Sequence, residues 1–263
     1  MFRKVYAARF EKPAGNGRNR ACFITCVDIA GQRVEAVVKL SALSESGAGT
    51  LIREAIAAFF AADLGLPVPE PLLVEVTDPF KSAVGQSDYA GLIQKSSRFA
   101  FGSTKLGPGF QIYAPAMRLN DAQVQCAAEI FVFDTFIANG DRAPKNPNCL
   151  HSGDYLSIID HDVSFLMGAL LFWKAPWELG GGEELSQVDR HIFWSQVRQK
   201  GLSFDRLKAA LVAISDERLD QYISALPPEW TMGNDIAQEA VSYIKRLREM
   251  SGEAFAEIQR VLQ

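Results

Sequence analysis

The chain has 263 residues, of which 48% are hydrophobic and 22% are charged, and its formal net charge is −4. These values are typical of a globular enzyme with a substantial core, and the acidic balance argues against a dedicated nucleic-acid binder. No stretch approaches the roughly 18 uninterrupted apolar residues of a membrane span, and the first residues show no signal-peptide pattern. The four cysteines lack a zinc-site spacing and indicate reduced thiols, so we expect a cytoplasmic protein.

The N-terminal third of the chain is predicted to be rich in β-structure. Its strand candidates are runs of β-forming residues bounded by turn residues: Ala21–Ile29, Val34–Leu40, Leu72–Val76 and Tyr89–Gln94. One helix is predicted from Thr50 to Leu64, where apolar residues recur at three- and four-residue steps. Gly65 and the prolines that follow it end this helix.

The rest of the chain is predicted to be mainly helical. Residues 95–115 are expected to form a loop with three glycines, and a helix follows from Asp121 to Ala138, capped by Asn120 or Asp121. Two short strands, Cys149-Leu150 and Tyr155–Ile159, precede the remaining predicted helices, which are residues 186–199, 204–214, 216–225 and 234–262. We therefore expect an α+β protein with two domains, a small β-rich lobe over residues 1–97 and a larger helical lobe over residues 98–263.

One segment carries the residues that phosphoryl transfer requires. Asp141 follows the long predicted helix, Asn146 comes five residues later, and Asp160 ends an apolar strand. The Asp-x₄-Asn spacing is that of a kinase catalytic loop, in which the Asp is the base and the Asn binds metal. Carboxylate and amide oxygens are the ligands that Mg²⁺ prefers, so this segment predicts a phosphotransferase.

The same residues resemble a known family. The string from Asn139 to Leu150 (Asn-Gly-Asp-Arg-Ala-Pro-Lys-Asn-Pro-Asn-Cys-Leu), followed by Ile-Ile-Asp-His-Asp, resembles the catalytic and metal-binding segments of the HipA-like kinases. It is more distantly similar to the phosphatidylinositol 3-/4-kinases. Further matching pieces are Gly-Asn-Gly-Arg-Asn-Arg at 15–20, Val-Val-Lys-Leu at 37–40, Arg53-Glu54, and Ala-Leu-Pro-Pro-Glu-Trp at 225–230, which is similar to the small, kinase-only branch of that family.

The resemblance implies a protein-kinase-like two-lobed fold and the use of ATP with Mg²⁺. It assigns Asp141 to the acceptor hydroxyl, and Asn146 and Asp160 to the metal. Lys39 is expected to contact the nucleotide phosphates and to pair with Glu54. The nucleotide-binding residues implied besides Lys39 are Gly15, Gly17 and Arg18 in the phosphate loop, and Gln94 and Lys95 in the hinge that meets the adenine.

Several readings of the function remain open. The first is a protein Ser/Thr kinase. The second is a catalytically weak pseudokinase or interaction module, because Ala143 replaces the His of larger relatives and the glycine loop is irregular. The third is a kinase of a lipid or a small molecule, since the sequence does not rank acceptors. Gly180–Gly182 is interpreted as a flexible linker in preference to the alternative, a mobile loop at which the acceptor docks.

Overall fold

The structure, a computed structural model, describes residues 1–15, 20–85, 89–167 and 173–263. It contains both helices and strands and divides into two compact units. The first unit comprises residues 1–56, 69–106 and 222–237, and the second comprises residues 57–68, 107–221 and 238–263. Within the described residues, no helix combines the length and the apolar character needed to cross a membrane.

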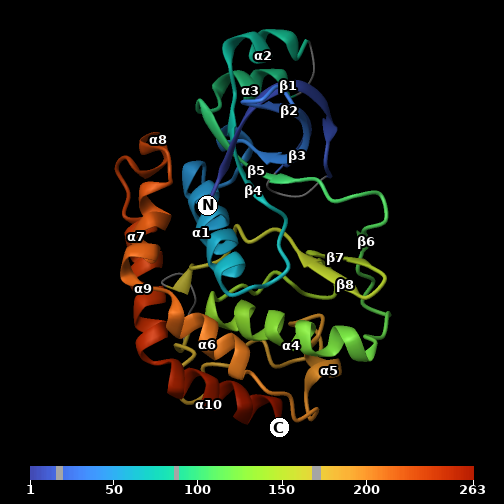
Figure 1. Cartoon of the computed structure of the whole chain (residues 1–263), viewed down its shortest axis with the longest axis vertical. Coiled ribbons are helices and arrows are strands. Elements are labelled where there is room, and N and C mark those ends of the chain that lie inside the picture. The colour runs from blue at the N-terminus through green and yellow to red at the C-terminus, as the bar shows by residue number, and fades with distance from the viewer. Residues whose placement is uncertain (16–19, 86–88, 168–172) are drawn as a thin grey trace. The chain divides into compact units, whose positions relative to one another are not determined.

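A closed five-stranded barrel forms the first unit (Figure 1). Its strands lie in the order β1, β2, β3, β5, β4, and a parallel pairing of β1 with β4 closes the ring. The strands are β1 (Arg3–Pro13), β2 (Cys22–Asp28), β3 (Arg33–Lys39), β4 (Pro71–Glu75) and β5 (Phe99–Thr104). The barrel leaves no unpaired edge, which protects a small sheet from pairing with other chains.

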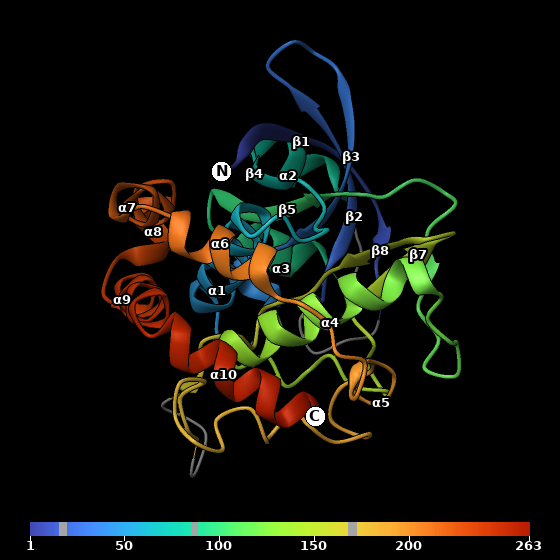
Figure 2. The ribbon, with the colours of Figure 1, turned by 60° about the horizontal axis from the view of Figure 1, so that its bottom comes forward.

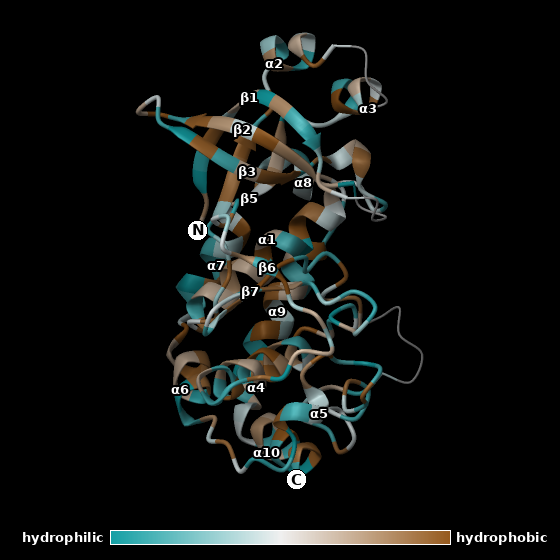
Figure 3. Ribbon diagram, turned by 90° about the vertical axis from the view of Figure 1, so that its right-hand side faces the viewer, coloured by the Kyte–Doolittle hydropathy of each residue, from teal (hydrophilic) through white to brown (hydrophobic). Residues whose placement is uncertain are grey.

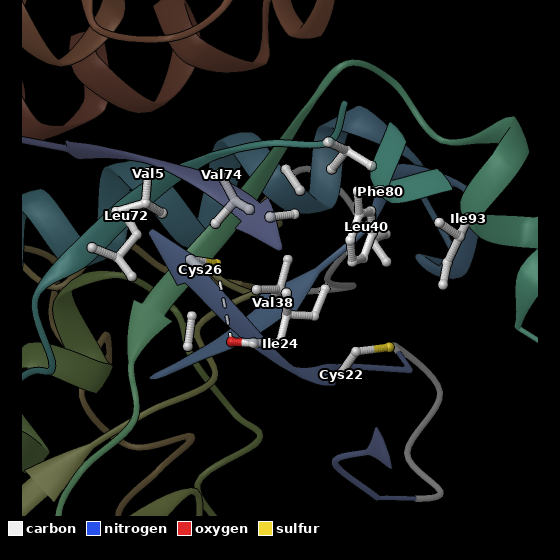
Figure 4. Close-up of a cluster of buried hydrophobic side chains, with 14 of the residues drawn as sticks. Val5, Cys22, Ile24, Cys26, Val38, Leu40, Leu72, Val74, Phe80 and Ile93 are labelled. Carbon is white, nitrogen blue, oxygen red and sulfur yellow. Dashed lines mark hydrogen bonds between the residues drawn. The ribbon is translucent and has the colours of Figure 1, made fainter. Parts of the chain in front are cut away.

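Alternation of buried and exposed residues explains how the barrel fills its interior. Along β2, every second residue from Cys22 to Cys26 is buried, because successive side chains of a strand point to opposite faces. Brown and teal stretches follow one another along β2 and β3 in Figure 3. Figure 4 shows the two cysteines among the aliphatic side chains of this core, where burial raises the pKa of each thiol to about 12.

Strand β5 was not expected from the sequence, because Gly102 interrupts its pattern of β-forming residues. The structure gives the reason for this glycine. A Cβ atom at position 102 would lie 2.6 Å from Cγ2 of Val74, on the neighbouring strand β4. A glycine inside a strand often marks such a close approach, so the loop predicted over residues 95–115 is wrong for Phe99–Thr104.

One helix of the first unit lies where the sequence predicted a strand. The strand predicted over Tyr89–Gln94 is wrong, because Ala90–Lys95 forms helix α3, which packs on α2 (Asp78–Ala83) beside the barrel (Figure 1). The other helical segments are η1 (Ser41–Leu43), α8 (Pro228–Thr231) and the first part of α1 (Ala48–Asp63), which continues into the second unit from Ala57.

Helix α4 (Asp121–Phe136) is the centre of the second unit. Asn120 caps it with a complete capping box, in which its side chain accepts from the Gln123 N–H and Gln123 accepts from the Asn120 N–H. In Figure 2, α10 (Ser251–Leu262) runs beside α4, and the rings of Phe136 and Phe255 meet edge to face at 5.2 Å between centroids. The start of α4 lies against the β7–β8 turn, where the Gln123 side chain donates to Gly153 O.

Most of the remaining elements of the second unit agree with the sequence-based expectations, but β6 (Gln111–Ile112) does not, because it lies within the loop predicted over residues 95–115. The other elements are β7 (Cys149–Ser152), β8 (Tyr155–Ile158), α5 (Trp194–Val197), α6 (Asp205–Ala213), most of α7 (Asp216–Ser224) and most of α9 (Ile236–Glu249). The helix predicted over 186–199 is wrong except for the short α5, and the helix predicted over 234–262 is interrupted at Met250, which separates α9 from α10.

Candidate active site

A buried ion pair lies at the end of strand β3 in the first unit. The Lys39 Nζ atom is 2.8 Å from Oε2 of Glu54 on helix α1, and both side chains are buried. A charged group out of contact with water is costly unless an opposite charge accompanies it. The expected pairing of Lys39 with Glu54 is therefore present, and it holds the ammonium group in a defined position.

The structure gives no comparable contact for the other predicted nucleotide-binding residues that it describes. Gly15 is exposed just after β1, whereas Gly17 and Arg18 lie outside the described residues. Gln94 and Lys95 are exposed at the end of helix α3, and the Gln94 side-chain amide donates to the backbone oxygen of Lys81 at 2.8 Å. The chain passes from the first unit to the second after Leu106, beyond these two residues.

The candidate catalytic loop is the segment 138–148 of the second unit, which we call loop 138–148. It begins where α4 ends, and Ala138 takes a positive φ of 54° that turns the chain away from the helix axis. The Asn139 N–H then donates to Asp134 O at 2.8 Å. The loop therefore starts from a helix end that its own backbone fixes.

Asp134, which is fully buried on α4, holds loop 138–148 through hydrogen bonds to two side chains of the loop. Its carboxylate accepts a bidentate pair of hydrogen bonds from Arg142, with Nε at 2.6 Å and Nη2 at 3.1 Å, and one from Asn139 Nδ2 at 2.8 Å. Burial acts to raise the pKa of Asp134, but the Arg142 guanidinium and the neighbouring His191 outweigh it and hold that pKa well below its usual range. Asp134 is thus an ionised carboxylate at neutral pH.

Arg142 extends this anchor to the segment after β8, which carries Asp160. Its Nη1 atom donates to the backbone oxygen of Asn148, at the end of the loop, and to that of Ile159 at 3.2 Å. The planar guanidinium has enough donors in a fixed geometry to serve all these acceptors at once. One side chain therefore joins α4, loop 138–148 and the end of β8.

His191 completes the anchor. Its Nε2 atom lies 3.0 Å from Asp134 Oδ2, while the Phe193 N–H donates to its Nδ1 atom at 3.2 Å. Since Nδ1 accepts, the proton of the neutral ring is on Nε2, which donates to Asp134. Burial lowers the pKa of His191, in keeping with a neutral ring. The predicted helix over 186–199 fails at this point because the next residue, Ile192, donates its N–H to Arg142 O.

The opposite side of the loop presents Asp141. Its Oδ2 atom accepts hydrogen bonds from two amides, Asn146 Nδ2 at 2.7 Å and Asn148 Nδ2 at 3.1 Å. Burial raises the pKa of Asp141 and the carboxylate of Asp162 raises it further, while the two amides and, more weakly, the charge of Arg142 act in the opposite direction. The result is a half-buried carboxylate that is more basic than an ordinary aspartate.

Two further acidic side chains follow β8. Asp160, which has a positive φ of 61°, and Asp162 bring carboxylate oxygens within 4.8 Å of each other. The sequence singled out Asp160 and Asn146 but missed Asp162 and Asn148. The sequence could have pointed to both residues, because Asp162 and Asn148 each lie two positions after a predicted metal ligand of the same residue type. Hard oxygen donors of this kind suit Mg²⁺.

Comparison with known proteins places these residues in a family. A model of the HipA-like kinases matches residues 37–257, a range that contains the Lys39–Glu54 pair, loop 138–148 and both aspartates after β8. A search of the curated proteins gave no match. Among solved structures, the chain is similar to the Helicobacter pylori proinflammatory kinase CtkA, with 13% identity and a TM-score of 0.47 over 100% of this chain and 96% of that chain. The family match covers most of the chain, and the protein therefore belongs to the HipA-like kinases.

Proposed function

We propose that this kinase transfers the γ-phosphoryl group of ATP to a hydroxyl group in an Mg²⁺-dependent reaction, and that the hydroxyl is that of a protein serine or threonine. The observation that carries the proposal is the environment of Asp141. Its Oδ2 atom receives two neutral amide donors, and within the described parts of the chain it forms no ion pair, while burial raises its pKa. A carboxylate in that state is suited to accept the proton of an attacking hydroxyl.

The fold implied by this function is a protein-kinase-like one with two lobes. We propose that the barrel unit is the nucleotide-binding lobe and the mainly helical unit is the catalytic lobe. The predicted lobe bounds, residues 1–97 and 98–263, differ from those of the two compact units and remain a prediction. Lys39, held by Glu54, neutralises charge on the nucleotide phosphates. Gly15, Gly17 and Arg18 remain predicted phosphate-loop residues, and Gln94 and Lys95 remain predicted hinge residues.

Asn146 and Asp160 are the proposed metal ligands, and Asp162 and Asn148 join them as candidates. The donor set fits the ion, because Asp160 and Asp162 bring two carboxylate oxygens within 4.8 Å, and amide oxygens complete a set of hard ligands. When bound, Mg²⁺ supplies positive charge to the phosphate oxygens. Arg142 holds the two halves of this set together through Asn148 O and Ile159 O.

Transfer of label from γ-labelled ATP to a protein acceptor tests the proposal. Wild type is compared with Asp141→Asn and Asp160→Ala, and with Asp235→Asn as a matched control at an exposed aspartate. We expect transfer by wild type and by the control, and a loss of about 10²–10⁴-fold in the other two variants. Equal transfer by all four proteins would show that neither carboxylate takes part.

The pseudokinase alternative is supported by Ala143, which stands in the loop where larger relatives have a histidine. A thermal-shift titration with ATP, with and without Mg²⁺, separates it from an active kinase. Stabilisation that needs no metal and is accompanied by no turnover favours a nucleotide-binding module. Transfer of label to a lipid or a small alcohol, and to no protein, would instead favour the third reading.

A further inference from the structure

A pocket of about 240 Å³ opens beside Asp141 in the second unit. Asp141 and Gly140 form one part of its lining, and Val163, Trp173, Glu184 and Leu185 form others. The pocket therefore combines the proposed base with an apolar and aromatic surface and with a second carboxylate. A concave site with a few convergent polar groups is the usual form of a small binding site.

The wall of this pocket around Gly181 has a fixed structure. A Cβ atom at position 181 would lie 1.9 Å from the backbone oxygen of Ala175, so this approach of two chain segments requires glycine. The N–H groups of Gly180 and Gly182 donate to Glu257 Oε1 on α10, at 2.9 and 3.4 Å. The interpretation of Gly180–Gly182 as a flexible linker is therefore wrong, because the segment is tied to a helix.

The charge in the pocket is negative. Glu184 is exposed, and it lies on the same pocket as Asp141. None of the described lining residues is a lysine or an arginine. Two cations next to lining residues in the sequence do not themselves line the pocket: the exposed Lys174 donates to Leu179 O at 3.0 Å, and Arg142 is buried on Asp134. Clefts lined by one sign of charge raise the local concentration of ligands of the opposite sign.

Trp173 adds a second preference for positive charge. Its ring lines the pocket and is supported by Tyr243, with 6.0 Å between ring centroids. The Tyr243 hydroxyl in turn donates to Phe136 O at 2.6 Å, which fixes that ring against α4. Tryptophan is the best of the aromatic side chains at binding an ammonium or guanidinium group.

We infer that this pocket binds the phosphate acceptor and selects one that carries a cationic group next to its hydroxyl, as in a serine or threonine flanked by lysine or arginine. The inference rests on the proposed function and adds the acceptor class to it. In the reaction, the acceptor oxygen forms a bond to the γ-phosphorus of ATP, the bond from that phosphorus to ADP breaks, and the hydroxyl proton passes to Asp141. Glu184 and Trp173 bind the cation and take no part in these bonds.

Matched peptides test the inference. Two serine peptides that differ only in lysine or glutamate beside the serine are compared as acceptors, together with a small amino alcohol. The enzymes are wild type, Glu184→Gln, Glu184→Lys and Asp189→Asn, the last being an exposed carboxylate that does not line the pocket. Asp141→Asn supplies the background, and turnover without acceptor is measured for every protein.

We expect wild type and Asp189→Asn to prefer the basic peptide by about tenfold or more in kcat/KM. Glu184→Gln reduces this preference through KM, and Glu184→Lys reverses it. Phosphorylation of the amino alcohol alone, with the same dependence on Glu184, would retain the cationic class and identify a small molecule as its source.

Two results overturn the inference in different ways. Asp141-dependent transfer without a charge preference, or with a preference that Glu184→Gln leaves unchanged, contradicts the acceptor class and leaves the proposed function standing. The absence of Asp141-dependent transfer to any acceptor contradicts the proposed function, and the inference falls with it.

Discussion

Loop 138–148 has an aspartate on each of its two sides, and the pKa values of these two carboxylates are shifted in opposite directions. On the side toward α4, which we call the back, Asp134 is fully buried and pairs with a cation, and its pKa is lowered. On the other side, which we call the face, Asp141 is half-buried and meets two neutral amides, and its pKa is raised. The only difference between the two carboxylates is what surrounds them.

Because of this difference, Asp134 serves to hold the loop in place, whereas Asp141 is left to take part in the proposed reaction. A cation paired directly with Asp141 would lower its pKa and weaken it as a base. Arg142 is the next residue in the sequence, but its guanidinium is committed to Asp134, Asn148 O and Ile159 O. We expect changes at the back to act on stability and changes at the face to act on turnover.

The largest expected effect is on the back. Arg142→Ala leaves the buried Asp134 carboxylate without its cation, and loss of one partner of a buried pair costs about 3–5 kcal/mol. Denaturant unfolding of the variant measures this cost. Arg142→Lys is also expected to be strongly destabilised, because an ammonium group cannot reproduce the bidentate geometry.

Arg246→Ala, which removes an exposed ion pair with Glu249, is the control and should change the unfolding free energy by about 0–1 kcal/mol. A cost for Arg142→Ala no larger than that of this control would show that the back does not hold the loop.

The next effect is on the face. Asn146→Ala removes a proposed metal ligand and one amide donor to Asp141, so we expect turnover to fall by about 10²–10³-fold. Its unfolding free energy should change by only about 1 kcal/mol, the net value of a neutral hydrogen bond.

Asn139→Ala gives the opposite pattern, because the Asn139 amide is buried on Asp134. We expect it to lose about 1–3 kcal/mol of stability and to lose less turnover than Asn146→Ala. If the two asparagine variants behave alike in both measurements, the division of the loop into a back and a face is wrong.

The smallest effect concerns pH. Burial lowers the pKa of His191, so the folded protein keeps this ring neutral at pH values where the unfolded chain, with a pKa of about 6.5, takes up a proton. The stability from this residue is complete above that unfolded value and is lost as pH falls below it, by at most about 1.4 kcal/mol per pH unit. His191→Gln keeps a donor for Asp134 and cannot titrate.

Unfolding free energies of wild type and His191→Gln between pH 7.5 and pH 5 measure this term. We expect a shallower loss of stability in the variant as the pH falls. Parallel curves for the two proteins would mean that His191 does not contribute to the pH dependence.

The sequence predicted the local features of this molecule better than those that depend on distant residues. The spacing of Asp141 and Asn146 and the helix ahead of them are local, and the strands β2, β3 and β4 followed from runs of β-forming residues. Strand β5 was missed because Gly102 is explained only by Val74 on another strand. The site-residue roles remain predictions, although the Lys39–Glu54 pair is present as expected.

The back of the loop could not have been predicted in this way. Asp134 lies in a mostly apolar helix, and nothing in the local sequence shows which residues it contacts. One of its partners, His191, is 57 positions further along the chain. The segment around His191 has helical periodicity, yet its backbone bonds to Arg142 O and its ring to Asp134 instead of completing a helix. Tertiary hydrogen bonds override the local preference there.

Asp134→Asn and Asp141→Asn, compared side by side for unfolding free energy and phosphate transfer, test the central claim most directly. We predict that Asp134→Asn loses about 3–5 kcal/mol of stability. Asp141→Asn should unfold within about 1 kcal/mol of wild type and lose about 10²–10⁴-fold of its transfer rate. Full transfer by Asp141→Asn, or an Asp134→Asn protein as stable as wild type, would contradict the account.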